Sequence, residues 1–375
     1  MFSVKKVVDV ARFVENAIKE IRDSCGGAGC VLAAVSGGVD SVTSAVLARK
    51  ALGDVVRTVF IDTGFMRVRE GEKVRRLLAG LLDVELVDRS QQFYSSLLGL
   101  KDAEQKRLVF RDTFYKVLGE LVSSYGCDYL VQGTIKADIV ETVGGVKTQH
   151  NVLSEELQRN YGVKVVEPLR ELYKNEVREV ARYLGIPNEI VARQPFPGPG
   201  LLVRTVGRFT LEKLEVVRRA TEVVEALLRD VGASQYFAAA WELELGAERE
   251  VCLQHRRCVR VQLLRVMATG VRDGRRVYRP VALLREGPDL SPSELTELAD
   301  RAGVSRFTLL VSEGGSGRYF VSVRAVRTED FMTADVVLPP RGLLEEVARR
   351  LLEIEGVAAV GFDITPKPPA TIEYE

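Results

Sequence analysis

The chain has 375 residues, of which 46% are hydrophobic and 28% charged, and its 53 basic and 52 acidic residues give a formal net charge of +1. A chain of this length exceeds the usual size of one hydrophobic core, so we expect two domains. The near-neutral charge argues against nucleic-acid binding as the main function, and no apolar run approaches the ~18 residues needed to span a membrane.

An amphipathic helix is predicted over residues 5–24. Acidic residues interrupt the apolar ones at helical spacing in MFSVKKVVDVARFVENAIKEI, which is not the pattern of a signal peptide. We therefore expect a cytoplasmic protein that binds no membrane.

The stretch Val31–Ser41, written VLAAVSGGVDS, predicts a buried strand, a tight turn and the start of a helix. Gly37 and Gly38 allow a sharp turn, and Asp40 and Ser41 are common near helix starts. Such a turn presents free N–H groups and the positive end of a helix dipole, so it predicts a phosphate site. No Lys follows Gly38, which excludes a Walker A loop. A turn with incidental glycines remains the alternative.

Strands alternate with helices through the first 190 residues, which predicts a doubly wound parallel sheet of the α/β class. The predicted strands are 54–62, 84–87 and 129–131, and the predicted helices are 70–82, 103–125 and 174–184. Asp62, Thr63 and Gly64 follow the second strand, at the sheet edge where ligands bind in such folds. A plain strand-to-loop turn remains the alternative.

Two irregular stretches follow. Residues 140–160 contain Gly144 and Gly145 without clear periodicity, which predicts a lid loop. Residues 193–204, RQPFPGPGLLVR, are too rich in Pro and Gly for regular structure, so we place the domain boundary near residue 205.

The second half predicts a smaller α+β domain, because its strands and helices do not alternate strictly. Its predicted helices are 211–231 and 343–354, and its predicted strands are 259–267, 278–284, 307–311, 318–326 and 361–364.

The five cysteines are odd in number and include no C-x-x-C pair, so no disulfide framework is expected in a chain this long. Cys252 and Cys258 flank His255, but this spacing fits no common zinc module and lacks a fourth ligand.

Several separate motifs together resemble GMP synthase, and SGGVDS itself resembles the loop of ATP pyrophosphatases. The others are EQKR at 104–107, QGTIKADIVET at 132–142, KTQHN at 147–151, EPLRELYKNEVRE at 167–179, RQPFPGPGL at 193–201, DFMTAD at 330–335 and KPPATIEYE at 367–375. The resemblance runs nearly end to end, is weakest over 235–320, and follows the family's order. It implies an adenine nucleotide alpha hydrolase-like ATP pyrophosphatase domain over 1–205 and a dimerisation and XMP-binding domain over 206–375, hence a homodimer.

The resemblance also implies a ligase reaction in guanine nucleotide biosynthesis. MgATP would adenylate the 2-oxygen of XMP and release pyrophosphate, and ammonia would then displace AMP to give GMP. Only about thirty residues precede SGGVDS, too few for a glutaminase domain. We therefore expect a separate glutaminase subunit to supply the ammonia.

Site residues follow from the same resemblance. The ATP-binding residues are Ser36, Gly37, Gly38, Val39, Asp40, Ser41 and Val42, with Asp40 also a ligand of Mg²⁺ or, alternatively, a helix cap. The catalytic residues are Asp138, Glu141 and Lys147. The XMP-binding residues are Arg107, Asp273, Lys367, Thr371 and Glu373.

The chain also departs from the family pattern. Gln149 replaces the first of two lid histidines. Asp273 stands one position from the usual acidic residue, so the acidic contact to XMP has either moved by one position or been lost. An additional stretch lies near 286–315. Two other classes remain as alternatives: a tRNA-thiolating pyrophosphatase, which the cysteine spacing and the charge do not support, and a nucleotide-binding regulatory protein without catalysis.

Overall fold

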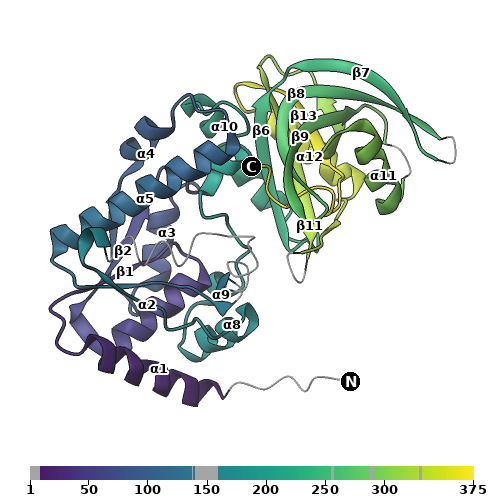
Figure 1. Cartoon of the computed structure of the whole chain (residues 1–375). Coiled ribbons are helices and arrows are strands. Elements are labelled where there is room, and N and C mark those ends of the chain that lie inside the picture. Colours follow the sequence, from purple (N-terminus) through teal and green to yellow (C-terminus); the bar gives the residue numbers. More distant parts are fainter. Residues whose placement is uncertain (1–8, 137, 140–158, 255–256, 288–289, 329–331) are drawn as a thin grey trace. The chain divides into compact units, whose positions relative to one another are not determined.

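The computed structural model describes residues 9–136, 138–139, 159–254, 257–287, 290–328 and 332–375. The chain forms two compact units (Figure 1). The first comprises Met1–Gly64, Arg69–Phe93 and Arg111–Pro195, and the second comprises Phe65–Val68, Tyr94–Phe110 and Phe196–Glu375. Two short stretches of the N-terminal half thus belong to the second unit. The predicted boundary at residue 205 stays a prediction.

The first unit is built on a five-stranded sheet with the order β3-β2-β1-β4-β5, in which every pair is parallel. The strands are β1 (Val31–Ala34), β2 (Val56–Asp62), β3 (Val84–Asp88), β4 (Tyr129–Val131) and β5 (Lys164–Val166). The chain moves outward from β1 to one side and then resumes at β4 on the other. This arrangement confirms the doubly wound parallel sheet, and it puts a topological switch point between β1 and β4.

Helices precede, connect and follow these strands, and none that the structure describes is long and apolar enough to cross a membrane. The helices are α1 (Val10–Cys25), α2 (Val39–Leu52), α3 (Glu70–Leu78), α4 (Ser90–Leu97), α5 (Ala103–Tyr125), α8 (Lys174–Tyr183) and α9 (Asn188–Val191), with 3₁₀ turns at Gly53–Val55 and Gly200–Arg204. The amphipathic α1 begins where the Asp9 carboxylate accepts a hydrogen bond from the Arg12 N–H, at 3.1 Å. It buries one face, formed by Val14, Ala17, Ile21 and Cys25.

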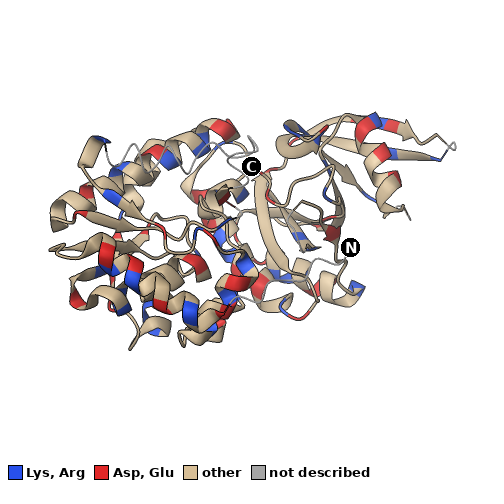
Figure 2. Ribbon diagram, turned by 60° about the horizontal axis from the view of Figure 1, so that its bottom comes forward, with Lys and Arg blue, Asp and Glu red and all other residues tan. Residues whose placement is uncertain are grey.

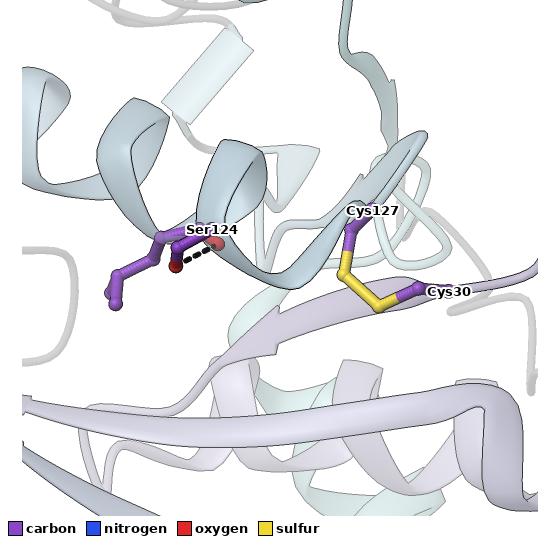
Figure 3. Close-up of a disulfide and its surroundings, with 4 residues drawn as sticks. Cys30, Ser124 and Cys127 are labelled. Atoms are coloured by element: carbon purple, nitrogen blue, oxygen red, sulfur yellow. Dashed lines mark hydrogen bonds between the residues drawn. A yellow bond between two sulfur atoms is a disulfide. The ribbon is translucent and has the colours of Figure 1, made fainter.

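Two disulfides contradict the expectation that the chain has no disulfide framework. Cys30 bonds Cys127 (Figure 3), Cys252 bonds Cys258, and Cys25 is free and buried. Cys30 immediately precedes β1, and Cys127 lies two residues before β4. Because β1 and β4 are parallel neighbours with Val31 opposite Tyr129, the two sulfur atoms meet although 97 positions separate them. Cysteine spacing along the chain contains no sign of this pairing.

The second unit is built on a mixed eight-stranded sheet, which confirms an α+β domain. The expectation that this domain is the smaller one is not confirmed, because the second unit contains more residues than the first. Seven strands follow the order β12-β11-β13-β10-β9-β8-β7, and β6 also pairs with β11. The strands are β6 (Gln235–Glu242), β7 (Leu245–Cys252), β8 (Cys258–Arg272), β9 (Arg275–Leu284), β10 (Arg306–Glu313), β11 (Tyr319–Arg327), β12 (Asp335–Val336) and β13 (Val357–Asp363). The helices are α10 (Leu211–Leu227), α11 (Pro292–Ala302) and α12 (Arg341–Leu352).

Sequence analysis missed β6, β7, β12 and α11 in this unit, and it missed β5, α4 and α9 earlier in the chain. The start of α11 carries a readable signal: Ser291 and Glu294 form a capping box, and Pro292 occupies the first turn. Seven of the eight residues of β7 are exposed or half-buried, so it lacks the apolar alternation that marks a strand.

A buried ionic cluster lies beneath the last residues of the chain. Arg306 and Arg324 both pair with Asp363, at 2.8 and 3.0 Å, and all three side chains are fully buried. The Tyr374 hydroxyl donates to the same carboxylate at 2.9 Å. Burial alone raises the pKa of Asp363, but the two guanidinium groups outweigh it and the pKa is lowered. The carboxylate therefore stays ionised inside the core.

Asp363→Ala should destabilise the second unit by roughly 3–5 kcal/mol, because it leaves two buried guanidinium groups without their shared partner. The measurement is the free energy of unfolding in urea. The control is Glu345→Ala, which removes an exposed ion pair with Arg341 and should leave the free energy of unfolding close to that of the wild type. Equal losses in the two variants would contradict the prediction.

Candidate functional site

The predicted phosphate loop occupies the turn between β1 and α2. Gly37 has a φ of +78°, a left-handed conformation that few other residues adopt. The Ser41 hydroxyl donates to the Gly38 carbonyl at 3.1 Å and accepts from the Ser36 N–H at 3.2 Å. The loop is thus folded back onto the first turn of α2, as an anion site at a helix start requires.

The helix start leaves its main-chain donors available. Gly38 is the N-cap and offers no side chain to satisfy the N–H groups of the first turn. Asp40 stands two positions inside the helix, so the alternative that Asp40 caps it is wrong. Val39 and Val42 are buried, and they anchor the helix by their side chains.

A second strand end approaches this helix start closely. An ideal Cβ on Gly133, just after β4, would lie 2.7 Å from the Ser41 nitrogen and 2.8 Å from the Asp40 carbonyl carbon. Only a residue without a side chain permits this approach, so glycine here lets the QGT turn after β4 lie directly against the loop.

Charged side chains gather beside the loop. The Lys174 ammonium, from the start of α8, pairs with Asp40 Oδ2. Asp138 accepts a hydrogen bond from the Ile135 N–H at 3.1 Å and lies near enough to Asp40 to affect its ionisation. Burial raises the pKa of Asp40 above its usual value, Lys174 and Arg178 oppose this, and Asp138 adds to it.

The residues present fit a divalent cation. Asp40 Oδ1 is buried and has no hydrogen-bond partner among the described residues. Asp40 and Asp138 offer the hard oxygen ligands that Mg²⁺ prefers, and the loop lies where phosphate oxygens would complete the set.

Asp62 ends β2 as predicted, but its carboxylate has a local role. Asp62 Oδ1 accepts a hydrogen bond from the Gly64 N–H at 2.8 Å, which closes the turn. The plain-turn interpretation is sufficient for this residue. Glu141 and Lys147 fall outside the described residues, as does most of the predicted lid.

Arg107 lies in the second unit, on the first turns of α5. Its guanidinium donates to Glu104 Oε2 at 3.2 Å and to the Tyr278 hydroxyl at 3.3 Å. Burial and then Arg276 lower the pKa of Arg107. The guanidinium groups of Arg107 and Arg276 are therefore close together here, which is an arrangement suited to an anion.

Asp273 and the C-terminal tail are also in the second unit. Asp273 and Gly274, with φ values of +50° and +70°, form the two-residue turn between β8 and β9, so Asp273 has a turn role of its own. Lys367 pairs with Ala334 across an isolated β-bridge. Thr371 hydrogen-bonds Arg306, and Glu373 pairs with Arg204 at 2.8 Å.

Sequence analysis did not single out Lys174, Glu70, Arg193 or Arg204. Lys174 and Arg193 do lie within quoted motifs, but a motif does not say which side chain another one contacts. Glu250, Cys252 and Cys258 come within 4.8 Å of one another, but both sulfur atoms belong to the disulfide and neither is a free thiolate.

The sequence was compared with models of protein families and with known proteins. Residues 312–374 match the family model described as GMP synthase C terminal domain, and residues 26–196 match that of thiamine biosynthesis protein (ThiI). The B subunit of GMP synthase (glutamine-hydrolyzing) from Saccharolobus solfataricus is 45% identical over 372 residues, 98% of this chain and 100% of the relative. The chain belongs to this family of GMP synthase subunits. The corresponding subunit of Sulfurisphaera tokodaii is 44% identical over all of both chains, and that of Archaeoglobus fulgidus is 41% identical over 98% of this chain and all of its own.

Among solved structures, NMN synthetase from Francisella tularensis covers 53% of this chain and 78% of its own, at 18% identity and a TM-score of 0.40. A glutamine-dependent NAD⁺ synthetase from Acinetobacter baumannii covers 53% and 38%, also at 18% and 0.40. These scores are too low to support a conclusion.

Gly133→Ala should move the QGT turn away from the loop and destabilise the first unit by about 1–3 kcal/mol, as overpacking does. The affinity for pyrophosphate, measured by calorimetry, should fall with it. Gly29→Ala is the control, since a Cβ there meets nothing within 4 Å and its φ is not positive. Unchanged stability and affinity in Gly133→Ala would contradict the close approach.

Lys174→Met should raise the pKa of Asp40 further, because it removes the main group that opposes the effect of burial. Carbon-13 NMR of the Asp40 carboxyl measures this directly, and its titration midpoint should move to higher pH. Lys174→Arg, which keeps the charge, should leave the midpoint close to that of the wild type. An unchanged midpoint in Lys174→Met would show that the ion pair is absent in solution.

Proposed function

We propose that this chain is the synthetase subunit of a glutamine-dependent GMP synthase, converting XMP, MgATP and ammonia to GMP, AMP and pyrophosphate. The observation that carries this is the phosphate loop at the switch point between β1 and β4, with the unpartnered Asp40 Oδ1 beside it. Similarity to GMP synthase subunits over 98% of the chain supports XMP as the nucleotide that would accept the adenylyl group.

The loop from Ser36 to Val42 would hold the phosphates of ATP through main-chain N–H groups. The α-phosphate gains negative charge during adenylation, and so does the departing pyrophosphate. Fixed donors stabilise such charge best, because they need no reorganisation when it develops. Asp40 and Asp138 would hold Mg²⁺, which supplies neutralising charge at the phosphate oxygens. Glu141 and Lys147 are proposed to act at the same centre.

XMP recognition is assigned to the second unit. Arg107 with Arg276 would bind a nucleotide phosphate, for which the guanidinium fork is suited. The positively charged Lys367 would bind the same nucleotide. Thr371 and Glu373 already have partners inside the unit, so their proposed role includes ordering the tail. Asp273 would contribute from its turn.

Ammonia is proposed to come from a separate glutaminase subunit, since the relatives are named as one subunit of a glutamine-hydrolysing enzyme. A homodimer formed through residues 206–375 and a cytoplasmic location are proposed on the same basis. Basic and acidic residues are interspersed on both units (Figure 2), and no observation favours RNA as a substrate.

The purified chain should convert XMP to GMP with ammonium and MgATP and release AMP and pyrophosphate in equal amounts. Chromatography of the nucleotides measures this. Glutamine should not replace ammonium unless the glutaminase subunit is added. ATP binding without AMP release would favour a regulatory protein instead.

Asp40→Asn should lower kcat at least about 100-fold in that assay, because it removes the charge that holds the cation beside the loop. The matched control is Asp54→Asn near the other end of α2, where the carboxylate is exposed and pairs with Arg49. Comparable activity in the two variants would remove Asp40 from the site.

A further inference from the structure

Gly37, the left-handed residue of the phosphate loop, rests on side chains from two other segments of the first unit. An ideal Cβ on Gly37 would lie 2.5 Å from Val74 Cγ2, 3.0 Å from Arg193 Nη1 and 3.5 Å from Glu70 Oε1. Val74 and Glu70 belong to α3, and Arg193 follows α9. The loop is therefore supported from outside as well as by its own hydrogen bonds.

Glu70 and Arg193 form an ion pair that is largely removed from water. The Glu70 side chain is 3% exposed and that of Arg193 16%. Glu70 lies in the first turn of α3, where the helix dipole favours a carboxylate. Arg193 Nη2 contacts the Glu70 carboxylate, and Nη1 points at the Gly37 carbonyl oxygen at 3.5 Å. The planar guanidinium can span both groups, and a lysine ammonium cannot do so in the same geometry.

This contact fixes the orientation of one peptide group. In a trans peptide the C=O and the N–H point in opposite directions. Because the Gly37 carbonyl faces Arg193, the Gly38 N–H faces the other way, where it meets the Ser36 hydroxyl at 3.4 Å. If this peptide group rotated, the Gly37 carbonyl oxygen would take the place of the Gly38 N–H. A bound anion would then face a hydrogen-bond acceptor and not the donor that it needs. Two glycines in succession make such a rotation easy, so an external contact is needed to prevent it.

We propose that Arg193, held by Glu70, is a positioning residue of the phosphate loop: it keeps the Gly38 N–H turned toward the bound phosphates. In this proposal the two side chains act on the loop through the Gly37 carbonyl. The inference rests on the proposed function, since it assigns the loop to the pyrophosphate part of ATP. It gives the first residue of RQPFPGPGL a role in ATP binding.

The test is the double variant Glu70→Met/Arg193→Met. Removing Arg193 alone would leave a buried carboxylate unpaired and risk unfolding, whereas replacing a buried pair by apolar residues is often neutral. The KM for ATP and the Kd for inorganic pyrophosphate should each rise about 10- to 100-fold, the worth of one hydrogen bond to a charged group. The KM for XMP and the melting temperature should stay close to those of the wild type.

Two further variants separate positioning from stability. Arg193→Lys keeps the charge opposite Glu70 but loses the fork, so its KM for ATP should fall between those of the wild type and the double variant. Glu72→Gln is the control, because Glu72 is exposed on α3 and lies two positions from both Glu70 and Val74. It should leave the KM for ATP, the KM for XMP and the melting temperature unchanged. A double variant with an unchanged KM for ATP would overturn the proposal, as would equal losses in the KM for ATP, the KM for XMP and the melting temperature.

The Gly38 amide resonance in nitrogen-15 NMR tests the same point without a nucleotide. Its chemical shift should change in the double variant and stay in place in Glu72→Gln. A wild-type chain that binds neither ATP nor pyrophosphate would defeat the proposed function. The Gly38 resonance would then still decide whether Arg193 orients the peptide, and an unchanged resonance would overturn that claim.

Discussion

The left-handed turn at Gly37 is the constraint on which the first unit depends. It lets the chain leave β1 and enter α2 within a few residues, so that the helix start faces the carboxyl edge of the sheet. Glycine at position 133 then lets the turn after β4 lie against the same helix start. The loop is held by two separate sets of contacts: Ser41 from within, and Glu70 with Arg193 from outside. The site is thus made largely of main-chain groups, whose positions these side chains maintain.

Opposing effects act on the Asp40 carboxyl at this edge of the sheet. Asp40 is pushed toward its neutral form by burial and by Asp138, and it is kept available as an anion by Lys174. One of its oxygens has no partner among the described residues. A cation placed there would satisfy that oxygen and relieve the repulsion from Asp138 at once. This supports a metal role for Asp40, and the helix does not need Asp40 as a cap, since it begins at Val39 with Gly38 as the cap.

The second unit contains ion pairs that are buried in its core. Arg306 and Arg324 are fully buried and both pair with the fully buried Asp363, and Arg306 also hydrogen-bonds the Thr371 carbonyl at 2.8 Å. The end of the chain is held in the same way: Arg204 pairs with Glu373, and the buried Lys106 with Glu375. Lys106 precedes Arg107 on α5, so the helix that carries the proposed phosphate ligand is tied to the chain terminus. The tail therefore has a structural role besides any contact with XMP.

Local sequence determined most of the architecture. The apolar run at Val31, the paired glycines and the alternation of strands and helices are local signals, and they predicted the parallel sheet and the strand–turn–helix of the loop correctly. Local signals failed for β7, because an exposed edge strand lacks apolar alternation, and for α11, whose capping box went unused. The motif order was enough to indicate the family.

Only the tertiary structure decided which side chains meet. The Cys30–Cys127 bond depends on β1 and β4 being neighbours, and the Asp40–Lys174 and Glu70–Arg193 pairs join segments far apart in the chain. Contacts of this kind follow from the order of the strands and the packing of the helices. The spacing of residues along the chain does not predict either. The sequence by itself thus determined that a glycine turn joins β1 to α2 and where it lies. Packing determined which side chains hold Gly37 and why the last residues of the chain are buried. It also determined that Asp40 Oδ1 has no hydrogen-bond partner among the described residues.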